Sequence, residues 1–319
     1  MKKILIKTVT VCVLVLLIPF ILTMLVKENK VTDSLEAMSF SVYYDANGSK
    51  SELSFEDYLL GVVAANMPAG YQMDALKAQA VIARTYALYN ATLLTRDNPA
   101  KTSFTTSELG LSYISLDSLE EYWGEADYHA YFTKLENAVY GTKNKVLLYK
   151  GSLILPVFFD TGSGFTRNAS EAWGIDVPYL VSVSSKQDVT STNYLKINEY
   201  KPADLITLLN RYYNNLNLKE ESFLKEVTVA SRDSAGYVLK IELGDKTVSG
   251  EEFAKVIGLP SNHFYMEEYE KKVRIICNGS GHGIGLSQYG ANAMAEEGSD
   301  YTAILTHYYT GVSVANLSE

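Results

Sequence analysis

Cysteine is scarce in this chain, and its two copies lie far apart in very different surroundings. Cys12 sits in an apolar run near the N-terminus and Cys277 sits near the other end, so we expect no internal disulfide in the part that follows the run. The histidines are scattered as well: His129, His263, His282 and His307. No cysteine and histidine cluster has the spacing of metal ligands, so the sequence predicts no structural zinc site and implies no other cofactor.

Basic side chains are outnumbered by acidic ones. Lysine and arginine total 28 and aspartate and glutamate total 37, which gives a net charge of -9 and a pI near 5.1. Nucleic-acid binding needs clustered lysine and arginine, so this class of partner is excluded. Tyrosine is abundant, with 24 residues. A ring with a polar tip suits a sugar-binding surface as well as a packed core.

One long hydrophobic run lies at residues 4–26, interrupted only by Lys7 and three threonines. Its length is close to the ~20 residues that cross a bilayer core. Lysines at positions 2, 3 and 7 keep the N-terminus cytoplasmic. A cleaved signal peptide is the alternative, but no small-x-small cleavage pattern directly follows the run.

These observations divide the chain into three parts. We expect residues 1–27 to form a cytoplasmic tip and a transmembrane signal anchor, and residues 28–38 to form a polar juxtamembrane linker. Residues 39–319 are predicted to form a single α+β domain on the extracytoplasmic side of the cell membrane. The domain has ample length for a buried core.

The first predicted helix is the best-marked element of this domain. Ser54 with Asp57 three positions later is typical of a helix start. Pro68 biases Met67 away from helical geometry, so Asn66 lies in the last turn of this helix. A second helix is expected at 74–94, with a stripe of small apolar residues that permits close packing.

The remaining elements follow from shorter signals. Residues 98–136 are polar and aromatic and are interpreted as an insertion, with a short helix near 133–140. The other predictions are strands at 39–44, 146–149 and 153–159, a turn at 47–48, helices at 202–214 and 251–257, and a hairpin of 227–230 with 237–243. Glycine-rich loops occupy 160–166 and 279–291, and Ser287 is the expected N-cap of a final helix.

The loops raise three chemical alternatives. A nucleotide site is disfavoured because the second loop lacks the Gly-Lys-Ser/Thr ending of a P-loop. A hydrolase triad of Ser163, His282 and Asp160 lacks the nucleophile-elbow pattern. His282 could donate to a sugar hydroxyl or could satisfy neighbouring backbone groups, and the sequence leaves both open. Glycoside cleavage uses two carboxylates, but the sequence alone pairs no two of the available ones: Asp74, Glu108, Asp160, Glu171 and Asp176.

Three separated segments carry the most specific motifs of the chain. The first segment is GVVAANMP at 61–68 with DALKAQAVIARTYA at 74–87. The second is FFDTGSGFT at 158–166, followed by EAWG at 171–174 and PYL at 178–180. The third is GHGIGLSQYGA at 281–291 with ILTHYY at 304–309. In this order the three segments resemble the stage II sporulation protein D family, which cuts bacterial cell-wall glycan. Their order makes a chance resemblance improbable, and the resemblance extends over roughly 40–314.

The resemblance implies a lytic transglycosylase that acts on peptidoglycan strands stripped of their stem peptides. The family places a glutamate before the Met-Pro, as general acid and then base, and this chain has Asn66 there. A carboxamide has no proton to give, and the loss of general acid catalysis typically costs ~10²–10⁴ in rate. Asp74 starts on a different element, so we expect loss of activity rather than rescue. The chain is then either an enzyme with a displaced acid or a glycan-binding activator of a partner amidase.

The resemblance also implies a cleft lined by Asn66 and the two glycine-rich loops. The expected substrate-binding residues are Arg84, Asp160, Ser163, Thr166, His282, Gln288 and Tyr289. We expect Arg84 to bind a carboxyl or acetamido oxygen of the sugar. The alternative is that Arg84 forms a salt bridge on the protein surface. The implied partners, beyond glycan strands, are a membrane-anchored amidase and endopeptidase and a multi-spanning membrane protein that act together during engulfment.

Overall fold

The computed structural model describes residues 40–46 and 49–317, and they form a mixed α+β fold. The predicted anchor, the linker and the turn at 47–48 lie outside the described residues. Within the described part, no helix combines the length and apolar composition needed to cross a membrane.

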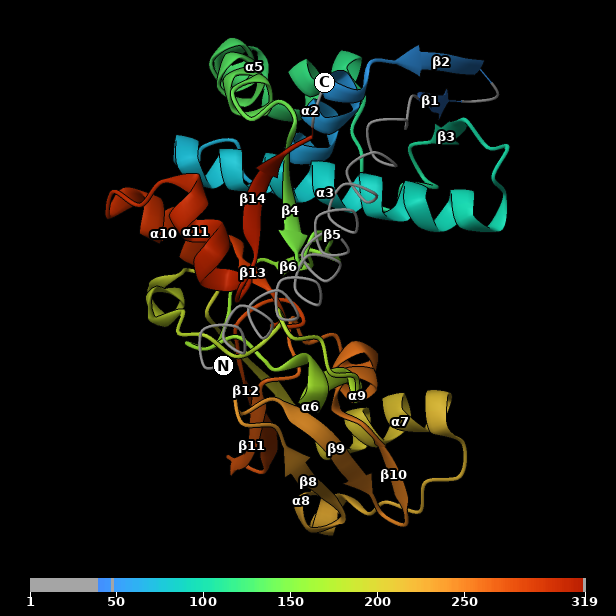
Figure 1. The fold of residues 1–319 in the computed structure, drawn as a ribbon. Helices are drawn as coiled ribbons and strands as arrows, with labels where there is room; N and C mark the ends of the chain where they lie inside the picture. Colours follow the sequence, from blue (N-terminus) through green and yellow to red (C-terminus); the bar gives the residue numbers. More distant parts are fainter. Residues whose placement is uncertain (1–39, 47–48, 318–319) are drawn as a thin grey trace, which may run out of the picture.

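Two consecutive helices form the centre of the upper lobe in Figure 1. Helix α2 (Phe55–Asn66) begins as predicted, because the Ser54 hydroxyl accepts a hydrogen bond from the Asp57 backbone N–H at 3.1 Å. It ends at Asn66, since Met67 has extended backbone angles before Pro68. Helix α3 (Met73–Asp97) runs three residues beyond the predicted end and buries most of its apolar residues.

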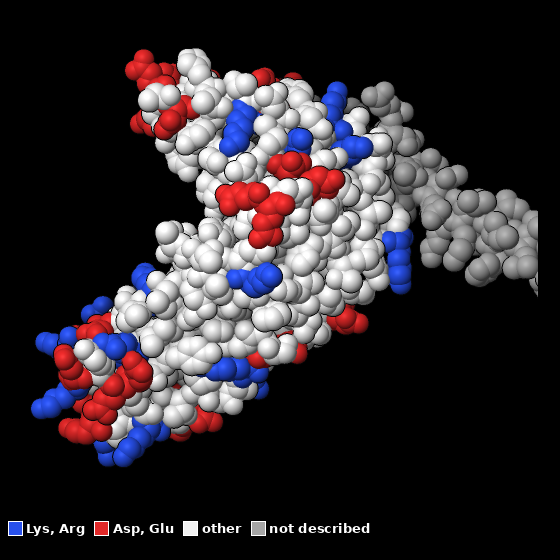
Figure 2. Space-filling model, turned by 90° about the vertical axis from the view of Figure 1, so that its left-hand side faces the viewer, with Lys and Arg blue, Asp and Glu red and all other residues white. Residues whose placement is uncertain are grey.

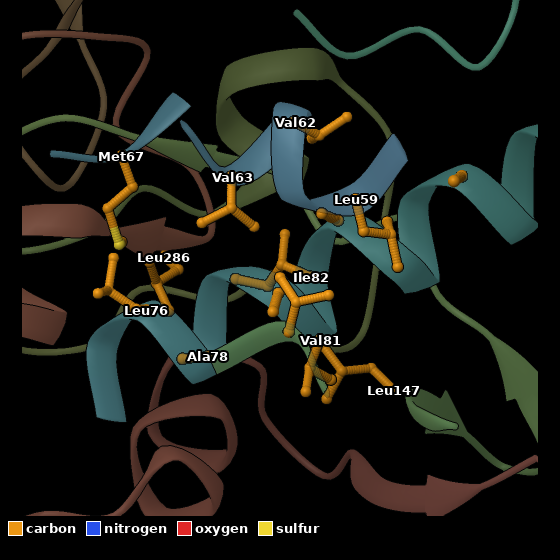
Figure 3. Packing of buried hydrophobic residues seen from close by; sticks show 14 of the residues in the cluster. Leu59, Val62, Val63, Met67, Leu76, Ala78, Val81, Ile82, Leu147 and Leu286 are labelled. Atoms are coloured by element: carbon orange, nitrogen blue, oxygen red, sulfur yellow. The ribbon is translucent and has the colours of Figure 1, made fainter. Parts of the chain in front are cut away.

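The core of this lobe is continuous between the helices and the C-terminal segment. Figure 3 shows Met67, Leu76 and Leu286 gathered at one end of the cluster, although they come from three distant parts of the chain. All three side chains are buried. Their packing fixes the end of α2 against the second glycine-rich loop.

The insertion is more helical than predicted. It contains η1 (Leu116–Ser118), α4 (Leu119–Trp123) and α5 (Glu125–Tyr140), with Gly124 at a φ of 80° between the two α-helices. Helix α5 packs against α2 and α3 through Leu135, Ala138 and Val139. These apolar residues recur at helical spacing, but the polar residues around them mask the pattern.

Short strands bring the two glycine-rich loops together. The predicted strand at 153–159 is divided into β5 (Ser152–Leu153) and β6 (Phe158–Phe159), with Pro156 between them. Strand β6 pairs in parallel with β13 (Leu286–Ser287). Gly281 has a φ of 107°, and a Cβ there would lie 2.7 Å from that of Phe159. Only glycine permits this approach of the two loops.

The rest of the upper lobe consists of short sheets and helices. They are β1 (Ser41–Ala46), β2 (Ser49–Leu53), β3 (Ser103–Thr105), β4 (Lys145–Tyr149), η2 (Lys186–Thr190), α10 (Gln288–Glu296), α11 (Tyr301–Tyr308) and β14 (Ser313–Asn316). Helix α6 (Ala169–Trp173) lies lower in Figure 1, although its Ala169 packs in the core of the upper lobe. Strand β1 lies between β2 and β3, and β4 lies between β14 and β5. The Ser287 hydroxyl caps α10 as predicted, since it accepts from the Gly290 N–H at 3.1 Å.

A second lobe, the lower one in Figure 1, has a hydrophobic core of its own. It contains β7 (Leu195–Tyr200), α7 (Pro202–Tyr213), η3 (Glu220–Ser222), α8 (Phe223–Glu226), β8 (Val227–Arg232), β9 (Val238–Leu243), β10 (Lys246–Ser249), α9 (Gly250–Ile257), β11 (Phe264–Tyr269) and β12 (Lys272–Asn278). The predicted hairpin is β8 with β9. The sequence predicts one domain, whereas the described residues divide their buried side chains between two clusters.

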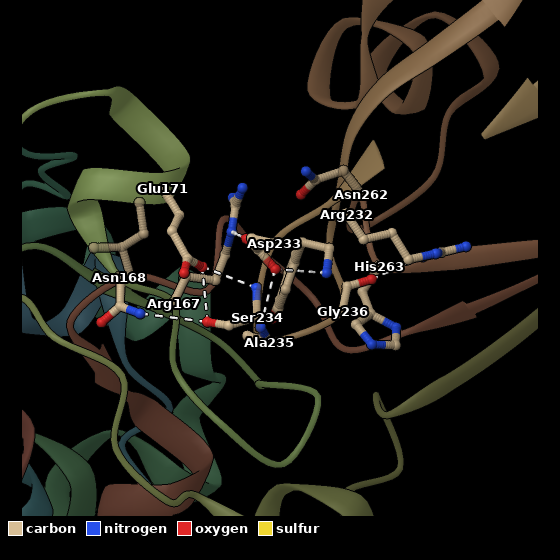
Figure 4. A network of polar contacts seen from close by, with 12 residues as sticks. Arg167, Asn168, Glu171, Arg232, Asp233, Ser234, Ala235, Gly236, Asn262 and His263 are labelled. Carbon is tan, nitrogen blue, oxygen red and sulfur yellow. Dashed lines mark hydrogen bonds and ion pairs between the residues drawn. The ribbon is translucent and has the colours of Figure 1, made fainter. Parts of the chain in front are cut away.

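A buried ion pair joins the lobes (Figure 4). Arg167, next to the first glycine-rich loop, donates from Nε to Asp233 Oδ2 at 2.6 Å, and both side chains are almost fully buried. The same guanidinium donates to Glu251 and to the His282 carbonyl, each at 3.0 Å. Polar contacts therefore fix the position of one lobe relative to the other.

Candidate functional site

An open groove of about 670 Å³ lies at the C-terminal end of α2. Its residues come from that helix end, the following turn and the insertion: Ala64, Ala65, Asn66, Met67, Pro68, Ala69, Gly70, Tyr71, Tyr122, Trp123 and Tyr131. None of them is acidic or basic. The face in Figure 2 is hollowed below an upper projection, and few charged side chains lie in the hollow.

Four aromatic side chains, here called the aromatic wall, line this groove: Tyr71, Tyr122, Trp123 and Tyr131. The Trp123 ring meets Tyr131 edge-on with centroids 5.8 Å apart, and Tyr122 is 58% exposed. The aromatic wall was not predicted as part of the site. The sequence contains one signal for it, because Tyr122 and Trp123 are adjacent aromatic residues in a polar stretch. A polar stretch has no core of its own that would require two large aromatic side chains.

Asn66 lies in the groove, and its amide group is held in one orientation. Its Nδ2 donates to the Val62 carbonyl at 2.7 Å and to the Ser112 carbonyl at 2.9 Å. A flipped amide would turn Oδ1 against these two oxygens, which would repel it. The amide is therefore a donor to the protein and offers no titratable proton to a ligand.

The same surroundings favour a protonated acid. Two carbonyl oxygens and the negative end of the α2 dipole face the side chain of residue 66. An ionised carboxylate there would be repelled by both, so its pKa would rise. The position suits a proton donor, and the residue that occupies it cannot act as one.

Gln288 is hydrogen-bonded to the backbone at the end of α2, next to the groove. It is 5% exposed, and its Nε2 donates to the Asn66 carbonyl at 2.6 Å and to Gln79 Oε1 at 3.2 Å. Predicted as a substrate contact, it is placed by the structure as a buried link between α10 and the end of α2.

Arg84 does not reach the groove, contrary to the expectation from the sequence. Its side chain is 1% exposed and its Nη2 lies 2.6 Å from Glu56 Oε2. It also donates to the Thr142 carbonyl at 2.7 Å and to the Val139 carbonyl at 3.2 Å. These carbonyls lie at the C-terminal end of α5, so Arg84 neutralises a helix end within the core. The alternative named a salt bridge, and one is present, but it lies inside the protein rather than on its surface, with Arg84 1% and Glu56 13% exposed.

Asp160 and Tyr289 lie beside the aromatic wall. The Asp160 carboxylate is half-buried and accepts from Thr161 Oγ1 at 3.1 Å and Asn193 Nδ2 at 3.0 Å. The Tyr289 N–H donates to the Asp160 carbonyl at 3.0 Å. Burial, followed by the charge of Asp160, raises the pKa of Tyr71 to about 12. Tyr71 therefore keeps its proton and remains a hydrogen-bond donor in the groove.

None of the other predicted loop residues lines the groove. The Ser163 hydroxyl is buried without a hydrogen-bond partner among the described residues. Thr166 is 1% exposed and accepts from the Val183 N–H at 2.9 Å. His282 Nδ1 accepts from the Ile284 N–H at 3.1 Å, and burial lowers the pKa of the imidazole. Of the two alternatives for His282, the structure supports the one in which it satisfies backbone groups.

No triad forms from these residues. In the part of the chain that the structure describes, no hydrogen bond joins Ser163, His282 and Asp160 to one another. The described residues also contain no cluster of three or more His, Cys, Asp or Glu side chains that could hold a metal ion.

Asp188 is hydrogen-bonded to both glycine-rich loops, and no motif in the sequence identifies it as a site residue. Its carboxylate is buried and accepts from the Gly162 N–H and from the Ser287 hydroxyl, each at 2.8 Å. Burial raises the pKa of this carboxyl, and the hydrogen bonds oppose the rise. Asp188 thus holds both glycine-rich loops through one side chain.

Changing Asp188 to asparagine is expected to remove a pH dependence of stability. Since the pKa of the folded form is raised, the contribution of Asp188 is fully present below about pH 4 and is lost as the pH rises through the folded pKa. The difference in unfolding free energy between the native chain and Asp188→Asn should therefore fall as the pH rises. Denaturant titrations at several pH values measure it, and a constant difference would contradict the placement of Asp188.

Residues 43–149 match the family model described as Stage II sporulation protein. The chain is 32% identical to stage II sporulation protein D of Bacillus amyloliquefaciens and 30% identical to that of Bacillus subtilis (strain 168), in each case over 99% of this chain and 96% of the relative. It is 28% identical to the amidase enhancer of Bacillus subtilis (strain 168), over 81% of this chain and 40% of that protein.

Proposed function

The chain belongs to the stage II sporulation protein D family, and from this premise we propose that it binds peptidoglycan glycan strands during sporulation without cutting them. The observation that carries the proposal is the Asn66 amide, held by two carbonyl oxygens in an aromatic groove. The groove supplies binding surface, and residue 66 supplies no acid.

The shape and chemistry of the groove support a sugar ligand. The faces of pyranose rings are apolar and their rims are polar, and they stack on aromatic rings that carry hydrogen-bonding tips. The aromatic wall provides three tyrosine hydroxyls and one indole N–H around an apolar floor. An open groove also admits a long chain, whose ends extend beyond the site.

Cleavage by a displaced acid is the competing function. Asp74 lies at the start of α3, where it accepts from the Tyr301 N–H at 3.2 Å and lies 3.8 Å from Lys77. It does not line the groove. Digestion of amidase-treated peptidoglycan with the native chain tests this function, because lytic transglycosylation leaves anhydro-sugar ends. Their formation by the native chain would overturn the proposal.

Replacing Trp123 by alanine is expected to weaken binding of stripped glycan about tenfold, because buried aromatic contacts commonly contribute more than about 1 kcal/mol. Affinity is measured by calorimetry with soluble strands. The matched control is Trp173→Ala, since Trp173 is 37% exposed on α6 and lies outside the groove. Equal effects of the two changes would count against the groove as the binding site.

We further propose that the chain acts at the cell membrane, with residues 1–27 as its anchor and the described lobes on the extracytoplasmic side. The likeness to an amidase enhancer supports an amidase as a partner. In this scheme the amidase removes stem peptides, and this chain holds the stripped strand for the engulfment complex, which includes an endopeptidase and a multi-spanning membrane protein.

A further inference from the structure

Lys134 places a cation at the rim of the groove. It lies on α5 one turn after Tyr131, a member of the aromatic wall. Its Nζ donates to the Gly70 carbonyl at 3.1 Å, and Gly70 lines the groove. An ammonium carries three N–H donors, so this bond orients the group and leaves donors for a ligand.

No acid of the described residues pairs with this lysine. It forms no ion pair within 4 Å in the described part of the chain, whereas Lys77, on α3, pairs with Asp74. Burial lowers the pKa of Lys134, since part of its hydration is lost. Such a group gains from an anionic ligand that restores the lost interactions.

Acidic side chains lie near the groove, and the charge of Asp160 acts on Tyr71. The residues that line the groove include no aspartate or glutamate. The acidic residues in the first turn of α5, Asp127 and Glu125, lie roughly 10 Å and roughly 13 Å from Lys134 along the helix axis. At these distances, exposed charges are largely screened at physiological salt.

We propose that Lys134 forms a carboxylate subsite that recognises the lactyl group of N-acetylmuramic acid in strands stripped of their stem peptides. This inference rests on the proposed function. In an intact strand, the lactyl group is joined to the peptide by an uncharged amide. An amidase adds water across this C–N bond, which frees the peptide amine and leaves a lactyl carboxylate on the sugar. The anion that Lys134 binds therefore exists only after the peptide has been removed.

The test compares two soluble ligands that differ in this carboxylate. One is glycan oligomers from amidase-treated peptidoglycan, and the other is chitooligosaccharide of equal length, which has no lactyl group. The full chain in detergent is measured by calorimetry. We expect the native chain to prefer the stripped glycan about tenfold, with a preference that decreases as salt is added.

Variants of Lys134 distinguish the contribution of its positive charge to binding from the contribution of the groove. Lys134→Met should lose the preference and keep its affinity for chitooligosaccharide, which also shows that the groove is folded. Lys134→Arg should retain the preference because the charge remains. Lys240→Met removes an exposed lysine from β9 in the other lobe and should leave both affinities unchanged.

The two proposals fail in different ways. Equal affinities of the native chain for both ligands, or a preference that survives in Lys134→Met, would overturn the carboxylate subsite and leave glycan binding intact. If the native chain binds neither ligand, the proposed function is wrong and the subsite falls with it.

Discussion

Replacing Asn66 with glutamate is expected to raise lytic activity well above that of the native chain. The carbonyl oxygens of Val62 and Ser112, together with the end of α2, favour the protonated form of an acid at this position. General acid catalysis typically contributes ~10²–10⁴ in rate, so the gain should exceed about 100-fold over the native background. Anhydro-sugar ends released from amidase-treated peptidoglycan measure it.

The matched control for this change is Asn66→Gln, which has the length and shape of glutamate and no titratable proton. It should bind glycan and release no anhydro ends. If Asn66→Glu binds stripped strands but does not cleave them, the groove is not positioned for catalysis. If the native chain and Asn66→Glu cleave at the same rate, the acid lies elsewhere and the amide is irrelevant to the chemistry.

The parts of the fold that the sequence predicted well depend on short-range signals. Ser54 and Ser287 were identified as helix caps from their own neighbours, and both hydroxyls make the expected bonds. Pro68 fixed the end of α2, and with it the place of Asn66 in the last turn. Each of these features is decided within about four residues, so no tertiary information was needed.

The parts that could not be predicted depend on which elements pack together. Arginine is usually exposed because of its charge. The burial of Arg84 is favourable because carbonyl oxygens at the end of α5 and the Glu56 carboxylate accept hydrogen bonds from it. Trp123 reaches the groove from an insertion, more than 50 positions after Asn66. Asp188 links two loops that meet only because β6 pairs with β13. None of these relations leaves a periodic trace in the sequence.

Changing Asp233 to asparagine is expected to lower the free energy of unfolding by about 3 kcal/mol or more. The Asp233 carboxylate is fully buried against Arg167 and also accepts from the Tyr237 N–H at 2.8 Å. Removing one member of a buried pair leaves an uncompensated charge, which costs about 3–5 kcal/mol. Arg167 keeps Glu251, whose side chain is 52% exposed, one carbonyl and the face of the Tyr237 ring, none of which replaces the buried carboxylate. Denaturant unfolding followed by fluorescence and circular dichroism measures the loss.

Two further variants decide whether the loss comes from the buried charge. Adding Arg167→Met removes that charge, so the double variant should be less destabilised than the sum of the two single changes. Glu199→Gln disrupts an exposed pair with Arg274 at 3.0 Å and should change stability by less than about 1 kcal/mol. Because Arg167 and Asp233 lie between the two cores, Asp233→Asn should also separate the unfolding of the lobes into two transitions. Additive single changes with one sharp transition would show that the apolar cores, rather than this pair, hold the lobes together.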